Sequence, residues 1–234
     1  MLASSLEDAW LVAVNIAARA GGDPGYPGLQ GPSDPPAATR PKRLAVLETA
    51  GWPAALPEAR DALEAALARI AAAGIAIARR GADPELGAIE AAITDAEPLT
   101  RRINAWEGRW PLNTYRSRDR SKLSDSALSR LATAEAMTLA DYGAALARRQ
   151  QIREAFADLA RSCDMAVTLA ATGPAPLGLG STGNPVFAVV PTLSLPVLSA
   201  AGLPLGLQVV GFEGGDARLF AGAAWLSELL SAAG

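Results

Sequence analysis

The feature that most constrains the fold is a strand–helix–strand pattern across residues 43–79. A short apolar run, RLAVLET at 43–49, has the length of a strand, and IAIAR at 75–79 has the same character. Between them, PEARDALEAALARIAAAG predicts a helix that begins at Pro57 and ends at Gly74. Its apolar face consists of Ala59, Leu63, Ala66, Leu67 and Ile70. Two strands joined by such a helix are expected to pair in parallel with a right-handed crossover, so the pattern predicts an α/β protein.

Further elements follow on both sides of this unit. DMAVTLA at 164–170 reads as another strand, and TLSLPVLS at 192–199 and LPLGLQVVG at 203–211 read as a hairpin. Ser4, with Glu7 three residues later, predicts a capping box at the start of a first helix, and Asp216 can cap a last helix that runs to Leu230. Residues 83–110 and 124–162 have helical patterns, with a polar and irregular stretch between them, and the proline- and glycine-rich loop 21–42 is expected to be irregular.

Length and composition limit the possible classes of protein. A chain of 234 residues suits a single domain, and 50% hydrophobic with 19% charged residues is typical of a globular protein. The net charge of −3, without a cationic stripe, argues against nucleic acid as a partner. The sequence has neither a basic signal-peptide start nor an apolar run of about 18 residues, so we expect no membrane association and a cytoplasmic location.

The side chains that common enzymes use are scarce in this sequence. There is no histidine, which excludes Ser-His-Asp and Cys-His sites and any zinc site that needs imidazole. Lys42 and Lys122 are the only lysines, and Cys163 is the only cysteine, so no intramolecular disulfide can form. We therefore predict no metal site and no cofactor.

Three short motifs have an ordinary structural interpretation that we favour. Gly178, Gly180 and Gly183 spell G-x-G-x-x-G, but a proline follows at once and no helix begins there, so a flexible loop is favoured over a dinucleotide site. Ser121 and Lys122 are adjacent in an arginine-rich, solvated stretch, which argues against a serine–lysine dyad. Cys163 has no activating partner in the sequence and is expected to be a buried apolar residue. The five tryptophans, Trp10, Trp52, Trp106, Trp110 and Trp225, are expected mostly in the core.

Several longer stretches together resemble the amidase signature family of amide hydrolases. They are CDMAVTLAATGPAP, TGNPVF, PTLSLPVL and GLPLGLQVVGFEGGDARLFAGAAWL in the last third of the chain, and SLEDAWLVAVNIAARAGGDPGYPG near its start. The resemblance implies an α/β fold with a mixed β-sheet flanked by helices, of which residues 1–234 would be the C-terminal portion, a single domain with a partial amidase-signature fold.

The resemblance also implies how relatives work and what this sequence lacks. Relatives use a lysine, a bridging serine in a cis peptide and a nucleophilic serine, all upstream of the region matched here, in and before a Gly/Ser-rich signature that this sequence does not contain. We therefore predict no catalytic residue. In relatives the loop matched by residues 172–187 borders the substrate, so the resemblance names Ser181, Thr182, Asn184 and Phe187 as substrate-binding residues. The alternative for these four residues is an ordinary polar loop with one aromatic side chain in the core. A Leu-Leu-Gly-like turn usual in the family is missing here, where Val190 meets Pro191 directly.

These observations lead to one main functional hypothesis and two alternatives. The main one is a truncated amidase-family hydrolase that is inactive alone and handles a small amide substrate only when a missing half completes it. The first alternative is a non-catalytic interaction module or one fragment of a split amidase, found as a homo-oligomer or with a partner chain, because half a fold exposes apolar surface. The second is an enzyme with a site built from serine and aspartate alone.

Overall fold

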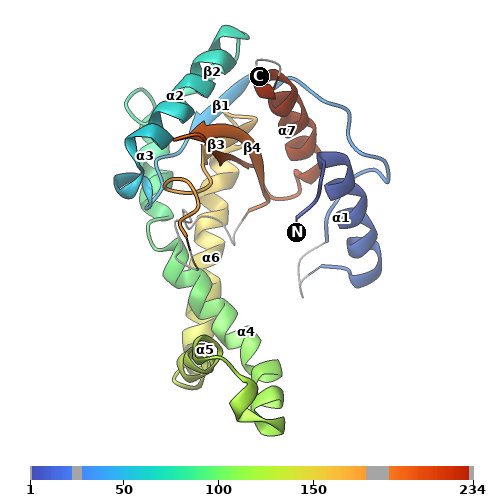
Figure 1. Cartoon of the computed structure of the whole chain (residues 1–234), viewed down its shortest axis with the longest axis vertical. Coiled ribbons are helices and arrows are strands. Elements are labelled where there is room, and N and C mark those ends of the chain that lie inside the picture. Colours follow the sequence, from blue (N-terminus) through green and yellow to red (C-terminus); the bar gives the residue numbers. More distant parts are fainter. Residues whose placement is uncertain (1, 23–27, 178–189, 232–234) are drawn as a thin grey trace.

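The chain contains one five-stranded mixed sheet. The structure, a computed structural model, describes residues 2–22, 28–177 and 190–231. The strands are β1 (Arg43–Val46), β2 (Ala76–Ala78), β3 (Met165–Leu169), β4 (Thr192–Ala200) and β5 (Leu203–Val210), in the spatial order β2-β1-β3-β5-β4. Strand β1 pairs in parallel with β2 and β3, whereas β5 pairs antiparallel with β3 and β4. The predicted α/β class, with a mixed sheet and flanking helices, is confirmed (Figure 1).

The β4–β5 hairpin turns tightly between Ala200 and Leu203. Ala201 and Gly202 both have positive φ, 51° and 75°, as a two-residue hairpin turn requires. Strand β4 contains a register shift between Leu195 and Leu198 and has a proline, Pro196, inside this irregular stretch. Both features are typical of an edge strand, and β4 is one of the two edge strands of the described sheet, with β2 at the other edge.

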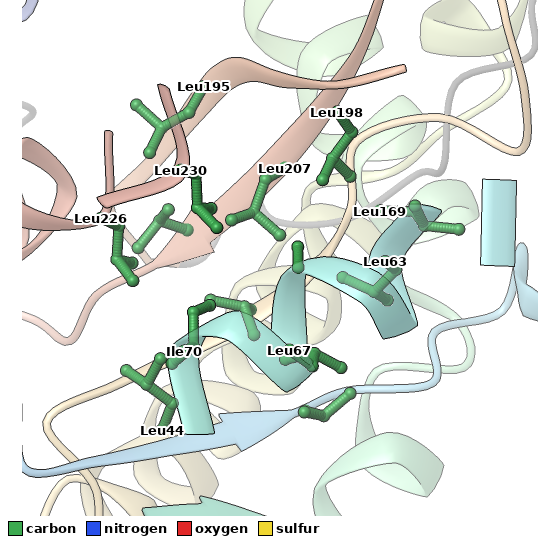
Figure 2. Close-up of a cluster of buried hydrophobic side chains, with 14 of the residues drawn as sticks. Leu44, Leu63, Leu67, Ile70, Leu169, Leu195, Leu198, Leu207, Leu226 and Leu230 are labelled. Atoms are coloured by element: carbon green, nitrogen blue, oxygen red, sulfur yellow. The ribbon is translucent and has the colours of Figure 1, made fainter. Parts of the chain in front are cut away.

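One face of the sheet is closed by α2 (Pro57–Ala72) and α7 (Asp216–Ser231) over an apolar core (Figure 2). The five α2 side chains predicted to share one face are the five that the helix buries. Leu169, Leu207 and Leu195 lie opposite one another on β3, β5 and β4 and all belong to this core. Helix α7 begins at Asp216, which is its first helical residue and not the cap before it as predicted, and the Gly215 carbonyl accepts the first helical hydrogen bond from the backbone N–H of Leu219.

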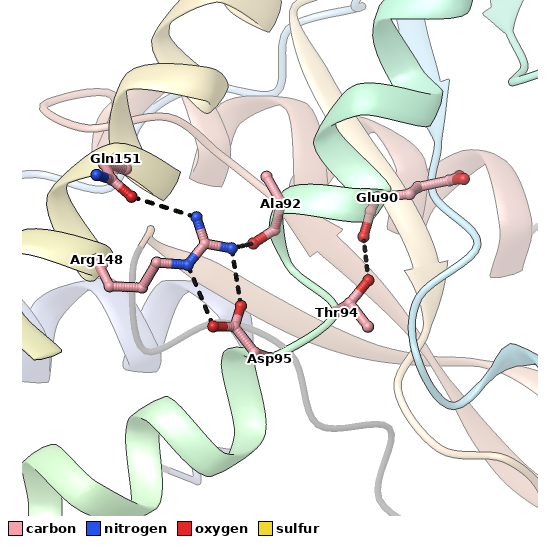
Figure 3. Close-up of polar contacts among 6 residues, drawn as sticks. All are labelled: Glu90, Ala92, Thr94, Asp95, Arg148 and Gln151. Atoms are coloured by element: carbon pink, nitrogen blue, oxygen red, sulfur yellow. Dashed lines mark hydrogen bonds and ion pairs between the residues drawn. The ribbon is translucent and has the colours of Figure 1, made fainter.

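The second face carries α3 (Pro84–Ala92), α4 (Ala96–Arg118) and α6 (Leu139–Leu159), which cover the β2-β1-β3 part of the sheet. The guanidinium of Arg148 on α6 binds the carboxylate of Asp95 through two hydrogen bonds, of 2.9 and 3.1 Å, and also the Ala92 carbonyl at 2.7 Å (Figure 3). Ala92 ends α3 and Asp95 precedes α4, so the Arg148 side chain fixes α6 to both ends of the turn between these two helices.

The predicted irregular stretch between the two helical regions is mostly helical, so this prediction was wrong. Helix α4 continues through Pro111 to Arg118, and the single turn η2 (Arg120–Lys122) and α5 (Asp125–Glu135) follow. Arg116 binds Glu135 of α5 at 2.6 Å, which holds the end of α4 against its neighbour. Helices α4, α5 and the adjoining part of α6 form an arm that extends away from the sheet (Figure 1). On this arm Trp110 and Leu139 are exposed rather than buried in the core.

Helix α1 (Leu6–Ala20) lies beside α7, at the margin of the molecule (Figure 1). Its N-cap is Ser5, whose side chain accepts from the backbone N–H of Asp8, so the cap predicted at Ser4 is displaced by one residue. Trp10 is fully buried, contacts Phe220 of α7 with a centroid separation of 4.9 Å, and donates its indole N–H to the Pro32 carbonyl. Residues 28–42 cross from α1 to β1 without forming a helix or a strand.

Two further structural facts bear on function. None of the described helices is long and apolar enough to cross a membrane. Leu56, which follows the short helix η1 (Trp52–Ala54) and is the N-cap of α2, contacts the loop after β3, because its backbone N–H donates to the Thr172 carbonyl at 2.8 Å. The loop that leaves the carboxyl end of β3 is therefore attached to the start of α2.

Candidate functional site

A row of polar side chains crosses three strands of the sheet. Thr168 on β3 lies opposite Gln208 on β5, which in turn lies opposite Ser194 on β4. Directly opposed residues of antiparallel strands project to the same face, so the three side chains form one row. Each of these residues has a sequence neighbour that points to the other face. Those neighbours, Leu169, Leu207 and Leu195, form an apolar row in the core. The sheet therefore has an apolar face and, back to back with it, a polar row.

The row leads from the interior to the surface. Thr168 is completely buried, Gln208 is half-buried and Ser194 is exposed. The Oγ1 atom of Thr168 and the Oε1 atom of Gln208 are buried and have no hydrogen-bond partner among the described residues. Buried polar atoms are nearly always hydrogen-bonded in folded proteins, so such pairs of orphaned atoms are a signal of a site.

Backbone approaches the row closely at Gly206. A β-carbon at this position would lie 2.4 Å from the Ser194 hydroxyl oxygen and 2.8 Å from the β-carbon of Ala170. Only glycine fits there without moving these neighbours, because two heavy atoms that are not bonded to each other do not approach within 3 Å in this way. The surface beside the polar row is thus lined by backbone and small side chains.

A buried carboxyl group lies at the carboxyl end of the adjacent strand β1. Glu90 of α3 is 7% exposed, and its Oε1 accepts from the backbone N–H of Glu48 at 2.7 Å, while Arg80 lies 3.4 Å from Oε2. Burial raises the pKa of Glu90 above its ordinary value, whereas the Glu48 N–H and the Arg80 charge act in the opposite direction. The carboxyl ends of parallel strands are where open α/β sheets bind ligands, so this edge belongs to the same candidate region.

The four residues predicted to bind substrate cannot be placed. Ser181, Thr182, Asn184 and Phe187 lie outside the described residues, as do the glycines of the G-x-G-x-x-G motif. The chain segment that contains them leaves the carboxyl end of β3, where Thr168 lies, and returns at β4, where Ser194 lies. Their role stays a prediction.

The serine and lysine that are adjacent in sequence do not form an activated pair. The Ser121 hydroxyl donates to Asp119 at 2.6 Å, and the Lys122 ammonium lies 3.7 Å from the same carboxylate. The Lys122 side chain is 82% exposed, and its ammonium lies beside the Asp119 carboxylate on the surface. The interpretation of this stretch as solvated surface agrees with these contacts.

The single cysteine is not an activated nucleophile. Cys163, two residues before β3, is buried, as the sequence predicted, and burial raises the pKa of its thiol. A raised pKa keeps the sulfur protonated, whereas the thiolate is the reactive form. Among the residues that the structure describes, no group of three or more cysteine, aspartate or glutamate side chains could hold a metal ion.

Sequence reasoning missed the polar row, although a signal for it was present. Thr168 is the one polar residue of MAVTL, and Gln208 is the one polar residue of LPLGLQVV. A lone polar side chain in an apolar strand is a candidate for a site, because burial of an unpaired polar group is unfavourable. The sequence does not show that the two lie opposite each other.

Comparison with known proteins identifies the fold. No family model matches the sequence, and the curated proteins contain no match. Among solved structures, an amidase superposes with a TM-score of 0.70 at 23% identity over 83% of this chain and 47% of its own. A bacterial aryl acylamidase of the amidase signature family gives 0.65 at 14% identity, over 82% and 44%. The 6-aminohexanoate cyclic dimer hydrolase with bound substrate gives 0.65 at 19% identity, over 97% and 54%.

These likenesses show a partial amidase-signature fold. Each superposition includes most of this chain, so the sheet and its helices as a whole have the arrangement found in these enzymes. The chain spans about half the length of the solved structures that it matches. The resemblance noted in the sequence is therefore confirmed for the fold.

Proposed function

We propose that these 234 residues are the substrate-site half of an amide hydrolase and that they hydrolyse no amide by themselves. The observation that carries this proposal is the match to amidases over most of this chain but only about half of theirs. Amide hydrolysis through an acyl-enzyme needs a nucleophile and a base that activates it. The Ser121 hydroxyl donates to the Asp119 carboxylate, and burial raises the pKa of the Cys163 thiol, so neither side chain is an activated nucleophile of this kind.

The polar row supports a role in binding a carboxamide. A carboxamide presents one carbonyl acceptor and N–H donors, and the hydroxyls of Thr168 and Ser194 and the amide of Gln208 can both donate and accept. Because the row leads from a buried hydroxyl to an exposed one, a small amide could enter from the Ser194 side. In this proposal Ser181, Thr182, Asn184 and Phe187 line the same space, and the nucleophilic serine and the lysine come from polypeptide outside this sequence.

The reaction would then divide between two parts of the fold. The catalytic serine attacks the amide carbonyl carbon, the C–N bond breaks, and the amine leaves with a proton returned by the base. Water then hydrolyses the ester and releases the carboxylic acid. The row of this chain would orient the carboxamide for that attack, and positioning of this kind contributes to the rate without supplying a nucleophile.

The test is the intact mass of the purified, folded chain after treatment with a serine-directed fluorophosphonate, together with an assay of simple aliphatic and aryl amides. We expect an unchanged mass and no hydrolysis above that of buffer. A stoichiometric adduct would contradict the proposal, because it requires an activated serine within this chain. Comparing Ser121→Ala and Ser194→Ala variants would then show whether Ser121 of η2 or Ser194 of the polar row is responsible.

A further inference from the structure

We infer that a cavity between α1, α7 and residues 35–38 is a binding site for a small organic ammonium ion, that is, a free amine with an apolar body. The cavity has a volume of about 280 Å³, and its apolar lining is interrupted by two carboxylates, those of Glu7 and Glu228. It lies at α7, which covers the apolar face of the sheet, whereas the polar row is on the other face. The inference is therefore independent of the proposed function.

Two neighbouring helices supply most of the cavity wall (Figure 1). Phe220, Ala224 and Glu228 are spaced by four residues on α7, so they lie on one face of that helix. Glu7 and Trp10 are three residues apart on α1 and likewise share a face. The rings of Trp10 and Phe220 pack edge to face with their centroids 4.9 Å apart. An aromatic pair therefore lines the cavity where the two helices meet.

The third wall is a proline-containing stretch that is bonded to both helices. The indole N–H of Trp10 donates to the Pro32 carbonyl at 3.1 Å, and the backbone N–H of Thr39 donates to the Ala221 carbonyl of α7 at 2.9 Å. The two prolines at 35 and 36, which line the cavity, lie between these attachments, and a proline ring fixes the φ angle of its residue. The cavity is therefore preformed, which lowers the entropic cost of binding a ligand.

The size and the lining of the cavity suit a single ring or a short alkyl chain. An apolar cavity of about 150 Å³ is large enough to bind benzene. A volume of about 280 Å³ can therefore hold one ring with a short substituent. Small-molecule sites are typically lined by apolar and aromatic side chains, with a few polar groups that fix the orientation of the ligand.

The charges of the lining residues select a cation. Glu7 and Glu228 are the two charged side chains among the residues that line the cavity, and both are exposed. Neither carboxylate forms an ion pair or a hydrogen bond with another residue of the described ranges. An ammonium ion would relieve the repulsion between two like charges and donate charge-assisted hydrogen bonds to both. A neutral molecule of the same shape lacks the charge, and an anion is repelled.

The alternative is an apolar gap with two solvated glutamates at its edge. In that case the charge of a ligand would not matter, because the carboxylates would interact with water. Ligands that have the same ring but different charges therefore distinguish the two interpretations.

The experiment titrates the full chain, labelled with nitrogen-15, at neutral pH and constant ionic strength. The probes are benzylammonium, benzyl alcohol and benzoate, which are similar in size and differ in charge. The readout is the indole N–H signal of Trp10 in the proton–nitrogen correlation spectrum. We expect benzylammonium to shift this signal in a saturable way, benzyl alcohol to bind at least about tenfold more weakly, and benzoate not to bind.

Variants with one carboxylate fewer locate the site. Glu228→Gln keeps the shape of the side chain and should weaken benzylammonium binding by about threefold to fivefold, as is usual for an exposed ion pair. The double variant Glu7→Gln/Glu228→Gln should bind benzylammonium no more tightly than benzyl alcohol. The matched control is Glu58→Gln, an exposed glutamate at the start of α2, which should leave the affinity unchanged. Ala224→Leu should reduce the binding of benzylammonium, because the larger side chain fills part of the cavity.

Four results would overturn the inference. They are no saturable shift with benzylammonium, equally tight binding of benzyl alcohol, an equal loss of affinity in Glu58→Gln and Glu228→Gln, and tighter binding of N-acetyl-lysine methylamide than of benzylammonium. The third result would show an effect of net charge alone, and the fourth would assign the cavity to a lysine side chain of a peptide. Thermal unfolding of each variant shows whether it is folded, and the substitutions at exposed glutamates keep the test valid if Ala224→Leu is not.

Discussion

Helices α1 and α2 have nearly the same length and are both rich in alanine and leucine, yet they are buried to very different extents. Helix α2 places five apolar side chains in the core beneath the sheet, whereas α1 buries Trp10 alone. The apolar face of α2 is buried in the core. In α1, by contrast, the apolar residues Leu11, Val12 and Ile16 are exposed. The difference teaches that an apolar side chain at helical spacing becomes buried only where another element of the fold packs against it.

The largest effect on stability is expected for substitution of Trp10, the one buried residue of α1. Trp10→Ala removes a completely buried indole, its contact with Phe220 and its hydrogen bond to Pro32, a change that typically destabilises by about 3–5 kcal/mol. Because Trp10 is the one buried residue of α1 and Leu6 is only partly buried against the core, we expect α1 to detach while the sheet stays folded. Hydrogen exchange should show loss of amide protection in α1 and unchanged protection in β1 and β3. Cooperative loss of protection in all three would show that α1 is part of the core.

A matched pair of leucine substitutions compares the two helices directly. Leu67→Ala in α2 should lower the free energy of unfolding by about 2–5 kcal/mol, because this side chain is 2% exposed in the core. Leu11→Ala in α1 should change it by less than about 0.5 kcal/mol, as is usual for surface positions. Urea unfolding monitored by circular dichroism measures both. Equal losses would mean that Leu11 is buried in the chain in solution.

Removal of the buried hydroxyl of the polar row is expected to stabilise the chain. Thr168→Val keeps the side-chain shape and removes an Oγ1 atom that has no partner among the described residues, and such groups are unfavourable by about 1–3 kcal/mol. We expect the free energy of unfolding to rise by roughly 1 kcal/mol. The control is Thr133→Val, whose hydroxyl donates to the Ser129 carbonyl on the helical arm, and which should give no gain. A loss of stability in Thr168→Val would mean that the hydroxyl is already satisfied.

The smallest effect concerns pH and the buried carboxyl of Glu90. Burial raises the pKa of Glu90 in the folded chain, so the native state holds this proton at pH values where the unfolded chain has lost it. The contribution to stability therefore falls as the pH rises from the ordinary glutamate pKa through the folded one. The side chain of Glu90→Gln does not titrate. The free energy of unfolding of this variant, relative to that of the parent chain, should therefore increase over the same pH window and then level off. A relative decrease would show that the Arg80 ion pair, 3.4 Å away, dominates instead.

The elements with a strong local pattern could be predicted from the sequence. The buried face of α2 follows from apolar residues at helical spacing, and the hairpin follows from two apolar strands joined by a short turn at Ala201 and Gly202. The stretch at 110–125 was mispredicted, because Pro111 and many polar residues suggested a loop. Contacts that no local rule contains, such as the Arg116–Glu135 ion pair between α4 and α5, favour the helix there.

The candidate site was harder to predict than the fold. The resemblance named residues of the loop after β3, which the structure does not describe, and it did not name Thr168, Gln208 or Ser194. These three lie within 41 residues of one another in sequence but become one row only through the register of two antiparallel pairings. A shift of one residue in either pairing would move a side chain to the other face.

The sequence by itself determined the α/β class, most of the helices and strands, and the absence of any histidine-based chemistry, because periodicity and composition act locally and can be read along the chain. The tertiary structure alone decided that Thr168 and Gln208 lie opposite each other on two strands and that Leu11, Val12 and Ile16 of α1 are exposed. The physical reason is that burial depends on what packs against a side chain. An apolar residue at the right spacing forms a helix face, but only its neighbours in space decide whether that face is core or interface.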